Sequence, residues 1–337
     1  MTELDSISQL ADRLLAAEHI AGSIFLYPHV SIDGDALGSM LALANALGQL
    51  NIRVRMPFDE EISDRLLFLP ELDRLEPFDE SLVAELASDQ QFALLVDCSD
   101  SGRIGRLKAL SDLAPQIGVI DHHVSGGQSG FLRWIDPTAA AVGEMVYDLI
   151  VELEKRTGRS LFNQTIGVLL MTAIVSDTGG FAFSNVSART FRTAAALMKN
   201  DIDLRTITYY LFDLTSQERM RLMGRVFTDA QFHYRGRLAI ALVDQELINS
   251  CGASDADLEG VIGHLRNVAG VEAAFLIREL PGQDLRVNIR SSEAFNAAEF
   301  ARLFGGGGHP RAAGLQFEPM PLDKAAALII NKAGEWL

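Results

Sequence analysis

The chain has 337 residues, of which 48% are hydrophobic, and its formal net charge is −16 at pH 7. This length is sufficient for two domains with their own cores, and the composition is typical of a globular protein rather than a disordered one. The acidic balance argues against duplex nucleic acid as a partner, because binding a duplex requires neutralisation of many phosphates, but it allows a short anionic substrate in a local basic pocket.

The sequence predicts neither a membrane segment nor a disulfide framework. The longest apolar run, 166–175, is about half the length that a helix needs to cross a bilayer. The first residues lack the basic start and apolar core of a signal peptide. The two cysteines, Cys98 and Cys251, lie far apart in the sequence. We therefore expect a cytoplasmic protein without a membrane partner.

The first half of the chain alternates predicted strands and predicted helices. The predicted strands are short apolar segments: 23–30, 52–57, 92–96 and 117–120. The predicted helices have apolar residues at helical spacing: 4–20, 36–50, 139–155 and 164–175. This alternation predicts an α/β domain with a doubly wound, mostly parallel sheet.

The second half predicts a helical segment followed by a smaller α/β unit. The segment 187–230 is charged and almost free of glycine and proline, which favours helices over a flexible linker. Further strands are predicted at 237–243, 271–277 and 285–289. We therefore expect a first domain at 1–190, a helical connector at 191–230 and a second domain at 231–337.

Aspartates and histidines gather in four places in the first half of the chain. Three groups follow predicted strands and one follows a predicted helix: His29 with Asp33 and Asp35, Asp97, Asp121 with His122 and His123, and Asp177. The carboxyl ends of parallel strands lie along one edge of a sheet, so these groups can converge. Carboxylate and imidazole ligands without thiolates suit Mn²⁺ or a similar ion, and two such ions are a common apparatus for displacement at phosphorus.

Each group alone also has an ordinary structural interpretation. Asp33 and Asp35 flank a glycine, as in turns and helix caps. Asp97 could cap a loop, and the adjacent His122 and His123 could be surface residues. The joint occurrence favours a metal site, because turns do not need histidine and caps do not need acids after several strands.

A glycine-rich segment in the second domain predicts an anion site. The segment 304–314 reads Phe-Gly-Gly-Gly-Gly-His-Pro-Arg-Ala-Ala-Gly, and its backbone N–H groups can approach an anion. The residues that we expect to form the site are Gly306, Gly307, Gly308, His309 and Arg311, with Arg290 and Ser291 from a nearby strand end. A glycine run alone is usually a flexible turn, and only the basic neighbours favour binding. Arg278 and Arg286 are interpreted as solvated.

Together these motifs resemble the DHH phosphoesterase superfamily. The N-terminal motifs are His-x-x-x-Asp-Gly-Asp-Ala-Leu-Gly-Ser from His29, Asp-Cys-Ser-Asp-Ser-Gly-Arg from Asp97, Asp-His-His from Asp121 and Ser-Asp-Thr-Gly-Gly-Phe from Ser176. The glycine-rich segment resembles the DHH-associated substrate-binding domain. The compact length is similar to the nanoRNase/pAp phosphatase branch, since single-strand-specific exonucleases of the superfamily are longer and family II pyrophosphatases have another C-terminal signature.

The resemblance implies a role for each motif residue. The implied metal ligands are His29 and Asp33 for one divalent ion, Asp35, His122 and Asp177 for a second, and Asp97 as a bridge between both. The ions would be Mn²⁺, with Mg²⁺ or Co²⁺ as alternatives. His123 would contact the scissile phosphate, and Asp121 would orient the histidines. Arg103 would meet a phosphate or, as an alternative, form a surface salt bridge.

Two positions depart from the family pattern. The family often has asparagine shortly after Asp-His-His, where this chain has Val-Ser-Gly-Gly at 124–127. It often has Ser-x-Arg-Ser before the glycine-rich segment, where this chain has Asn-Ile-Arg-Ser at 288–291. Neither stretch contains a predicted metal ligand, and both lie where the resemblance places a nucleotide, so the choice of substrate stays open.

The implied activity is two-metal hydrolysis of short single-stranded oligoribonucleotides, of dinucleotides such as pApA, or of 3′-phosphoadenosine 5′-phosphate. The first domain would perform catalysis, and the second would hold the far end of the substrate. Three alternatives stay open: a cyclic di-AMP phosphodiesterase, a pyrophosphatase or polyphosphatase, and a nucleotide-binding regulatory protein without catalysis. A homodimer is implied by the resemblance only.

Overall fold

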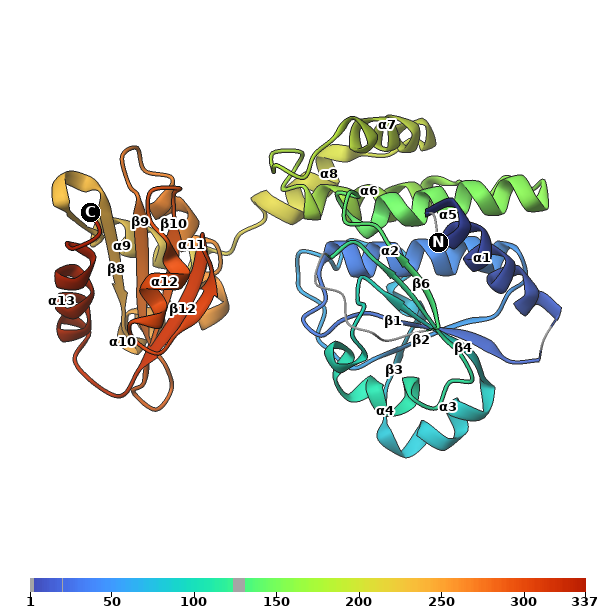
Figure 1. The fold of residues 1–337 in the computed structure, drawn as a ribbon, viewed down its shortest axis with the longest axis horizontal. Helices are drawn as coiled ribbons and strands as arrows, with labels where there is room; N and C mark the ends of the chain where they lie inside the picture. Colours follow the sequence, from blue (N-terminus) through green and yellow to red (C-terminus); the bar gives the residue numbers. More distant parts are fainter. Residues whose placement is uncertain (1–2, 20, 124–130) are drawn as a thin grey trace. The chain divides into compact units, whose positions relative to one another are not determined.

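The protein consists of two α/β units, Met1–Leu214 and Thr215–Leu337, in a computed structural model that describes residues 3–19, 21–123 and 131–337 (Figure 1). Each unit has its own sheet and its own hydrophobic core. The predicted α/β class is confirmed. Among the described helices, none is long and apolar enough to cross a membrane.

The first unit is built on a six-stranded parallel sheet in the order β3-β2-β1-β4-β5-β6. Its strands are β1 (Ser23–Tyr27), β2 (Val54–Phe58), β3 (Leu75–Pro77), β4 (Gln90–Val96), β5 (Ile117–Asp121) and β6 (Leu132–Ile135). The chain adds strands outward from β1 in one direction and then, from β4, in the other. In open α/β sheets, ligands bind in the crevice at the carboxyl ends of the strands where this reversal occurs.

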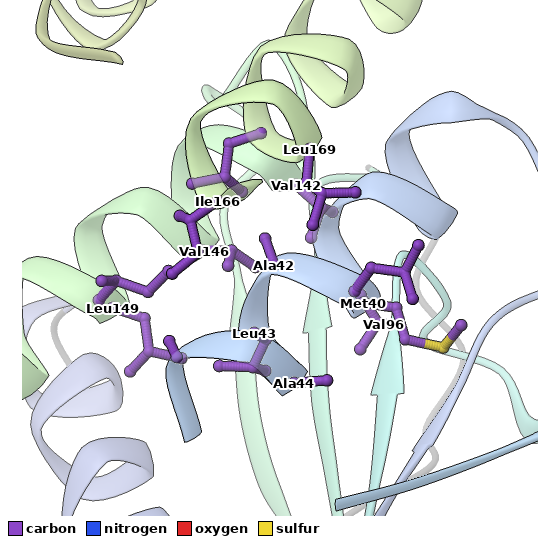
Figure 2. Close-up of a cluster of buried hydrophobic side chains, with 14 of the residues drawn as sticks. Met40, Ala42, Leu43, Ala44, Val96, Val142, Val146, Leu149, Ile166 and Leu169 are labelled. Atoms are coloured by element: carbon purple, nitrogen blue, oxygen red, sulfur yellow. The ribbon is translucent and has the colours of Figure 1, made fainter. Parts of the chain in front are cut away.

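Helices cover both faces of this sheet (Figure 1). They are α1 (Glu3–Ala16), α2 (Gly34–Gln49), α3 (Val83–Asp89), α4 (Lys108–Ser111), α5 (Val142–Thr157), α6 (Gln164–Asp177), α7 (Ala188–Leu197) and α8 (Leu204–Thr208). Helix α2 is buried on nearly all sides, because it lies between the sheet and helices α5 and α6 (Figure 2). A Cβ on Gly38 would lie 2.4 Å from the carbonyl oxygen of Leu169, so glycine permits the close approach of α2 and α6.

The boundary between the units follows Leu214 and therefore lies within the segment predicted as a helical connector. Leu197, Ile207 and Leu211 belong to the core of the first unit, because α7 and α8 pack on α6. Helix α9 (Gln217–Thr228) instead buries Leu222 and Val226 in the second unit. The helices of the segment 191–230 are thus divided between the two units.

The second unit has a mixed six-stranded sheet in the order β11-β12-β10-β9-β8-β7. Its strands are β7 (Gln231–His233), β8 (Leu238–Val243), β9 (Ala273–Glu279), β10 (Leu285–Ser291), β11 (Gly307–His309) and β12 (Ala312–Phe317). Its helices after α9 are α10 (Gln245–Ser250), α11 (Val261–Arg266), α12 (Ala297–Arg302) and α13 (Leu322–Ala333). Helices α12 and α13 pack on one face of the sheet, and α9, α10 and α11 pack on the other.

Candidate metal centre

Three neighbouring strands bring polar side chains to one edge of the first sheet. His29 follows β1, Asp97 follows β4, and Asp121 ends β5. All three side chains are buried, with exposed fractions of 7%, 1% and 0%. Buried ionisable groups are rare without a partner or a metal. The structure therefore brings the predicted strand-end residues together at the reversal point of the sheet.

The start of helix α2 supplies two aspartates with different surroundings. Asp33 is the N-cap residue, and its carboxylate accepts hydrogen bonds from the backbone N–H groups of Asp35 and Ala36 at 3.1 and 3.0 Å. Asp35 is fully buried and accepts hydrogen bonds from the backbone N–H groups of Val142 (2.6 Å) and Gly143 (2.9 Å). Two successive N–H groups at the start of α5 thus stabilise the Asp35 carboxylate.

Three overlapping groups of side chains could each hold a metal ion. Two of these groups consist of the predicted metal ligands, and the third joins His123 to Asp97 and His122. In the first group, His29 Nε2 lies 3.4 Å from Asp97 Oδ2 and 3.9 Å from Asp33 Oδ1. In the second, His122 Nε2 lies 3.2 Å from Asp177 Oδ2, the last residue of α6, and 3.8 Å from Asp35 Oδ2.

Asp97 connects the two groups. Its Oδ2 faces His29, and its Oδ1 lies 3.6 Å from His122 Nε2. Asp97 also has a φ of +59°, in the left-handed region that aspartate adopts less often than glycine. Unusual backbone conformations of this kind gather at functional sites. One carboxylate therefore faces both candidate metal positions.

The site contains buried polar atoms without hydrogen-bond partners and several carboxylates close together. A divalent ion would stabilise both. Asp97 Oδ1 and His122 Nε2 are buried and have no hydrogen-bond partner in the part of the chain that the structure describes. Burial and the neighbouring carboxylates raise the pKa values of Asp35 and Asp97. Burial alone would lower the pKa of His122, but Asp177, Asp35 and Asp97 raise it to about 10. Raised pKa values mean that these groups tend to hold protons when no metal is bound. Carboxylate oxygens and imidazole nitrogens are suitable ligands for a divalent ion, which would take the place of those protons.

Both histidines are oriented by backbone carbonyl groups. The Nδ1 of His29 donates to the carbonyl oxygen of Val30 at 2.8 Å, and the Nδ1 of His122 donates to that of Ala139 at 3.2 Å. Each Nε2 then faces the carboxylates, as is usual for histidines that bind metals. The segment 139–143 therefore orients His122 through a carbonyl group and Asp35 through N–H groups. Sequence reasoning missed this segment, because backbone groups leave no residue-type signal.

His123 and Asp121 form a pair beside the two groups. The Nδ1 of His123 donates to Asp121 Oδ1 at 2.7 Å, and this contact raises the pKa of His123. Burial alone would raise the pKa of Asp121, but hydrogen bonds from His123 and Ser99 hold it below the usual value. The side chain of His123 is 41% exposed. Asp121 thus holds the Nδ1 side of the His123 ring in place, while the ring as a whole is accessible to solvent.

Arg103 lies in the loop after β4. Its carbonyl oxygen accepts a hydrogen bond from the N–H of Val30 at 2.8 Å, which ties this loop to the loop that contains His29. Its guanidinium is exposed, and no ion pair involves it within the described ranges. The family departure at 124–127 lies outside the described residues.

In the second unit the glycine-rich segment forms a hairpin. Strand β11 pairs antiparallel with β12, with Gly308 opposite Ala313. A Cβ on Gly306 would lie 2.3 Å from the carbonyl oxygen of Gly314, and a Cβ on Gly308 would lie 2.6 Å from that of Ala312. These two glycines are therefore required by close strand packing, and the hairpin places β11 at the edge of the sheet.

The basic residues near this hairpin differ in their surroundings. Arg290 of β10 and His309 of β11 both lie opposite Ala312 of β12. Ala312 is therefore flanked by one exposed basic side chain on each side. Ser291 is buried, and its hydroxyl donates to the carbonyl oxygen of Pro310 at 3.1 Å. Arg311 donates to the carbonyl oxygen of Ser292 at 2.7 Å.

Two domain families match the chain. The DHH family N-terminal domain matches residues 23–174, and the DHHA1 domain matches residues 239–335. The first match contains every predicted metal-site residue except Asp177, and the second contains the hairpin.

Named relatives are similar over almost the whole chain. The bifunctional oligoribonuclease and PAP phosphatase NrnA of Thermus thermophilus is 29% identical over 321 residues, which cover 94% of this chain and 91% of the relative. The protein of the same name from Bacillus subtilis is 28% identical over 296 residues, covering 87% and 88%. An exopolyphosphatase-related protein from Bacteroides fragilis shares the fold, with a TM-score of 0.85 and 22% identity over 98% of this chain and 97% of that one. The chain therefore belongs to the DHH phosphoesterase superfamily, in its NrnA-like branch, and is a phosphodiesterase/phosphatase hydrolase.

Proposed function

We propose that the protein hydrolyses short oligoribonucleotides, dinucleotides of the pApA type and 3′-phosphoadenosine 5′-phosphate with the help of two divalent metal ions. The single observation that supports this most strongly is the position of Asp97, whose two carboxylate oxygens face two separate groups of metal-binding side chains. The Thermus thermophilus and Bacillus subtilis relatives are named as oligoribonucleases and PAP phosphatases, which supports the same substrates here.

The two groups define the proposed ligand sets. His29 and Asp33 would hold one ion, Asp35, His122 and Asp177 would hold the other, and Asp97 would contribute to both. Bound divalent ions supply an activated water and stabilise negative charge on phosphoryl oxygens. Mn²⁺ suits this set of oxygen and imidazole donors, and Mg²⁺ or Co²⁺ are the alternatives.

The protein groups beside the ions orient the ligands and the substrate. The carbonyl groups of Val30 and Ala139 accept hydrogen bonds from the Nδ1 atoms of the two metal-site histidines, so Nε2 is the nitrogen that each neutral imidazole would offer to an ion. Asp121 holds His123 by its Nδ1 and stabilises the charged form of this imidazole. We propose that the exposed part of His123 donates to the scissile phosphate, and that Arg103 adds positive charge on the same side.

The second unit would hold the far phosphate of the substrate. Arg290 and His309 are exposed in one row of the sheet with only Ala312 between them, which leaves room for an anion. Ser291 and Arg311 are bonded to backbone carbonyl groups, so we assign them to support of the hairpin. Two buried free cysteines, Cys98 and Cys251, fit a reducing cytoplasm as the place of the reaction.

The experiment is hydrolysis of a small substrate panel with Mn²⁺ and with EDTA. The panel contains a five-nucleotide RNA, pApA, 3′-phosphoadenosine 5′-phosphate, cyclic di-AMP and pyrophosphate. We expect Mn²⁺-dependent release of mononucleotides from the RNA and pApA, and of phosphate from 3′-phosphoadenosine 5′-phosphate. Turnover of pyrophosphate alone, or of cyclic di-AMP alone, would replace the proposal by the corresponding alternative. Nucleotide binding without any turnover would make the protein a regulatory one.

A further inference from the structure

The second sheet has one face that is only partly covered. Strand β9 contributes to hydrophobic clusters on both faces, whereas β10, β12 and β11 lie toward the edge of the sheet, beyond β9. Alternate residues of β10 point to opposite faces: Val287 and Ile289 are buried in the core under α12 and α13. The residues of the other face, which we call the open face, are Arg286, Asn288, Arg290, Ala312, Gly314, Gln316, Gly307 and His309.

Small residues form the middle of the open face and polar residues flank it. Asn288 lies opposite Gly314, which lies opposite Gly307, so this row has a single side chain on β10, β12 and β11. On the other side of Asn288 the row continues to the buried Leu276 of β9, where helix α11 packs against β9 and β10. A Cβ on Gly307 would meet no atom within 4 Å. A ligand can therefore lie against the backbone of β12 and β11, beside the Asn288 side chain that separates the two arginines of β10.

Arg286, on the open face, has a like-charged residue directly opposite it. It lies directly opposite Arg278 of β9, and like charges in directly opposite positions destabilise a sheet. Arg278 is neutralised by Asp255, with Nη1 2.5 Å from Oδ2. The nearest acid along the strand, Asp284, accepts a hydrogen bond from Gln316 at 3.1 Å.

The guanidinium of Arg286 is exposed and makes neither a hydrogen bond nor an ion pair anywhere in the described part of this unit. In a protein whose net charge is −16, an arginine without an acidic partner beside a second arginine is an unusual arrangement. Local arrangements that oppose stability without a structural gain are expected at functional sites. An external anion would supply the counter-charge that Arg286 lacks among the described residues.

We propose that Arg286 and Asn288 extend the anion site of Arg290 and His309 along β10 and bind a second phosphate of a single-stranded oligonucleotide. The inference rests on the proposed function and adds that the protein distinguishes its substrates by the length of the oligonucleotide. Arg286 and Arg290 are four residues apart on one strand, which corresponds to about 13 Å. This distance is longer than one step between phosphates, so an oligonucleotide of several residues reaches both arginines and 3′-phosphoadenosine 5′-phosphate reaches one.

The test compares R286A with R302A in the full-length chain. Arg302, on α12, is also exposed and has no ion pair in the described ranges, but it lies on the side of the sheet opposite to the open face. Both variants remove one positive charge from the same unit. Binding of a labelled five-nucleotide RNA is measured in EDTA by fluorescence anisotropy between 50 and 200 mM salt, with 3′-phosphoadenosine 5′-phosphate as competitor.

We expect R286A to weaken binding of the five-nucleotide RNA roughly three- to tenfold, the effect of about one exposed phosphate contact. The slope of log K against log salt should fall by about 0.7, the value for one phosphate of a single strand. Affinity for 3′-phosphoadenosine 5′-phosphate should stay unchanged in R286A, and R302A should match the wild type with both ligands. The melting temperature of R286A should be equal to or above that of the wild type, because a like-charge pair is removed.

Two results would overturn the inference. If R286A lost equal affinity for the RNA and for 3′-phosphoadenosine 5′-phosphate, Arg286 would bind the first phosphate. If R286A and R302A lost equal affinity for the RNA, the effect would be a general one of charge. Failure of the proposed function is separate, since it appears as absence of hydrolysis by the wild type with Mn²⁺, whereas binding in EDTA still reports on Arg286.

Discussion

The two units of the chain present their charged residues in opposite ways. In the first unit, Asp35 and Asp97 are 0% and 1% exposed and are held at the reversal point of a parallel sheet. In the second unit, Arg286, Arg290 and His309 are exposed on one face of a mixed sheet. Buried, crowded charges need a fixed counter-charge, whereas exposed ones are free to meet a mobile ligand. Under the proposed function, the first unit would bind the metal ions and determine the rate, and the second would determine the affinity for the substrate.

The largest effect is expected from D97N in the first unit. Replacement of the carboxylate that faces both ligand groups should lower kcat/KM on the order of a thousandfold or more, because both proposed metal positions lose a ligand. The matched control is D100N. Asp100 lies in the same loop, is exposed and caps the turn by accepting from the N–H of Gly102 at 2.8 Å. D100N should keep activity close to that of the wild type, and hydrolysis that persists in D97N would refute the two-metal account.

The next largest effect concerns the support of the metal centre by Arg189. Its guanidinium contacts Asp136 at 2.5 Å, Asp148 at 2.8 Å and the fully buried Glu144 at 3.6 Å. R189A would leave these acids without their cation and should lower the free energy of unfolding by about 2–3 kcal/mol, measured by urea denaturation at neutral pH. It should also weaken Mn²⁺ binding, because these acids flank the segment 139–143 that orients Asp35.

The control for R189A is R156A, at the other end of α5. Arg156 contacts Glu152 and the largely exposed Asp12, so its removal should lower the free energy of unfolding by about 1 kcal/mol or less and leave Mn²⁺ binding unchanged. Equal losses of metal affinity in both variants would contradict a specific role of Arg189.

The effect of R189A should also depend on pH. Burial alone would raise the pKa of Asp136, but hydrogen bonds from Thr138 and Arg189 hold it below the usual value. A carboxyl group with a lowered pKa in the folded state adds stability at neutral pH, and this stability disappears as the pH falls through that pKa. The difference in unfolding free energy between R189A and the wild type should therefore shrink in acid, and a difference that grows would contradict the ion pair.

A smaller effect distinguishes a closely packed glycine hairpin from a flexible turn in the second unit. G306A places a Cβ 2.3 Å from the carbonyl oxygen of Gly314 and should lower the free energy of unfolding by about 1–3 kcal/mol. The Cβ of G307A would have no atom within 4 Å, so G307A should lower the free energy of unfolding much less and is the matched control. Thermal denaturation of both variants gives the comparison, and equal stabilities would contradict the close strand packing.

The smallest effect is expected for the exposed anion site. R290A should raise KM about tenfold for every substrate with a terminal phosphate and change kcat little, since one charge-assisted contact is lost in binding. Steady-state kinetics on the five-nucleotide RNA provides the measurement, with R302A as the control. A fall in kcat at constant KM would move Arg290 from substrate binding to the chemical step.

Sequence reasoning succeeded where side-chain type and position are sufficient. The strands β1, β4 and β5 were predicted because they are continuous apolar runs, and the polar residues after them were expected at one edge because parallel strands align their ends. The short strands β3, β6 and β7 and the hairpin β11–β12 were missed, because strands of three or four residues and glycine-rich strands have no distinctive pattern.

The remaining features depend on tertiary contacts. Nothing in the sequence links Asp35 to the N–H groups of Val142 and Gly143, or Arg189 to Glu144, because these residues are far apart along the chain or act through backbone groups. The register that places Arg286 opposite Arg278 likewise depends on strand pairing. Spatial coincidences of this kind become visible only in the folded chain.

The most direct test of the central claim is the Mn²⁺ stoichiometry of the wild type and of D97N, measured by calorimetry together with electron paramagnetic resonance. We expect two Mn²⁺ ions per wild-type chain with a spin-coupled signal, because one carboxylate faces both groups. D97N should lose the coupled signal and at least one ion. A wild-type chain that binds a single ion, or a D97N chain that keeps two coupled ions, would contradict this claim.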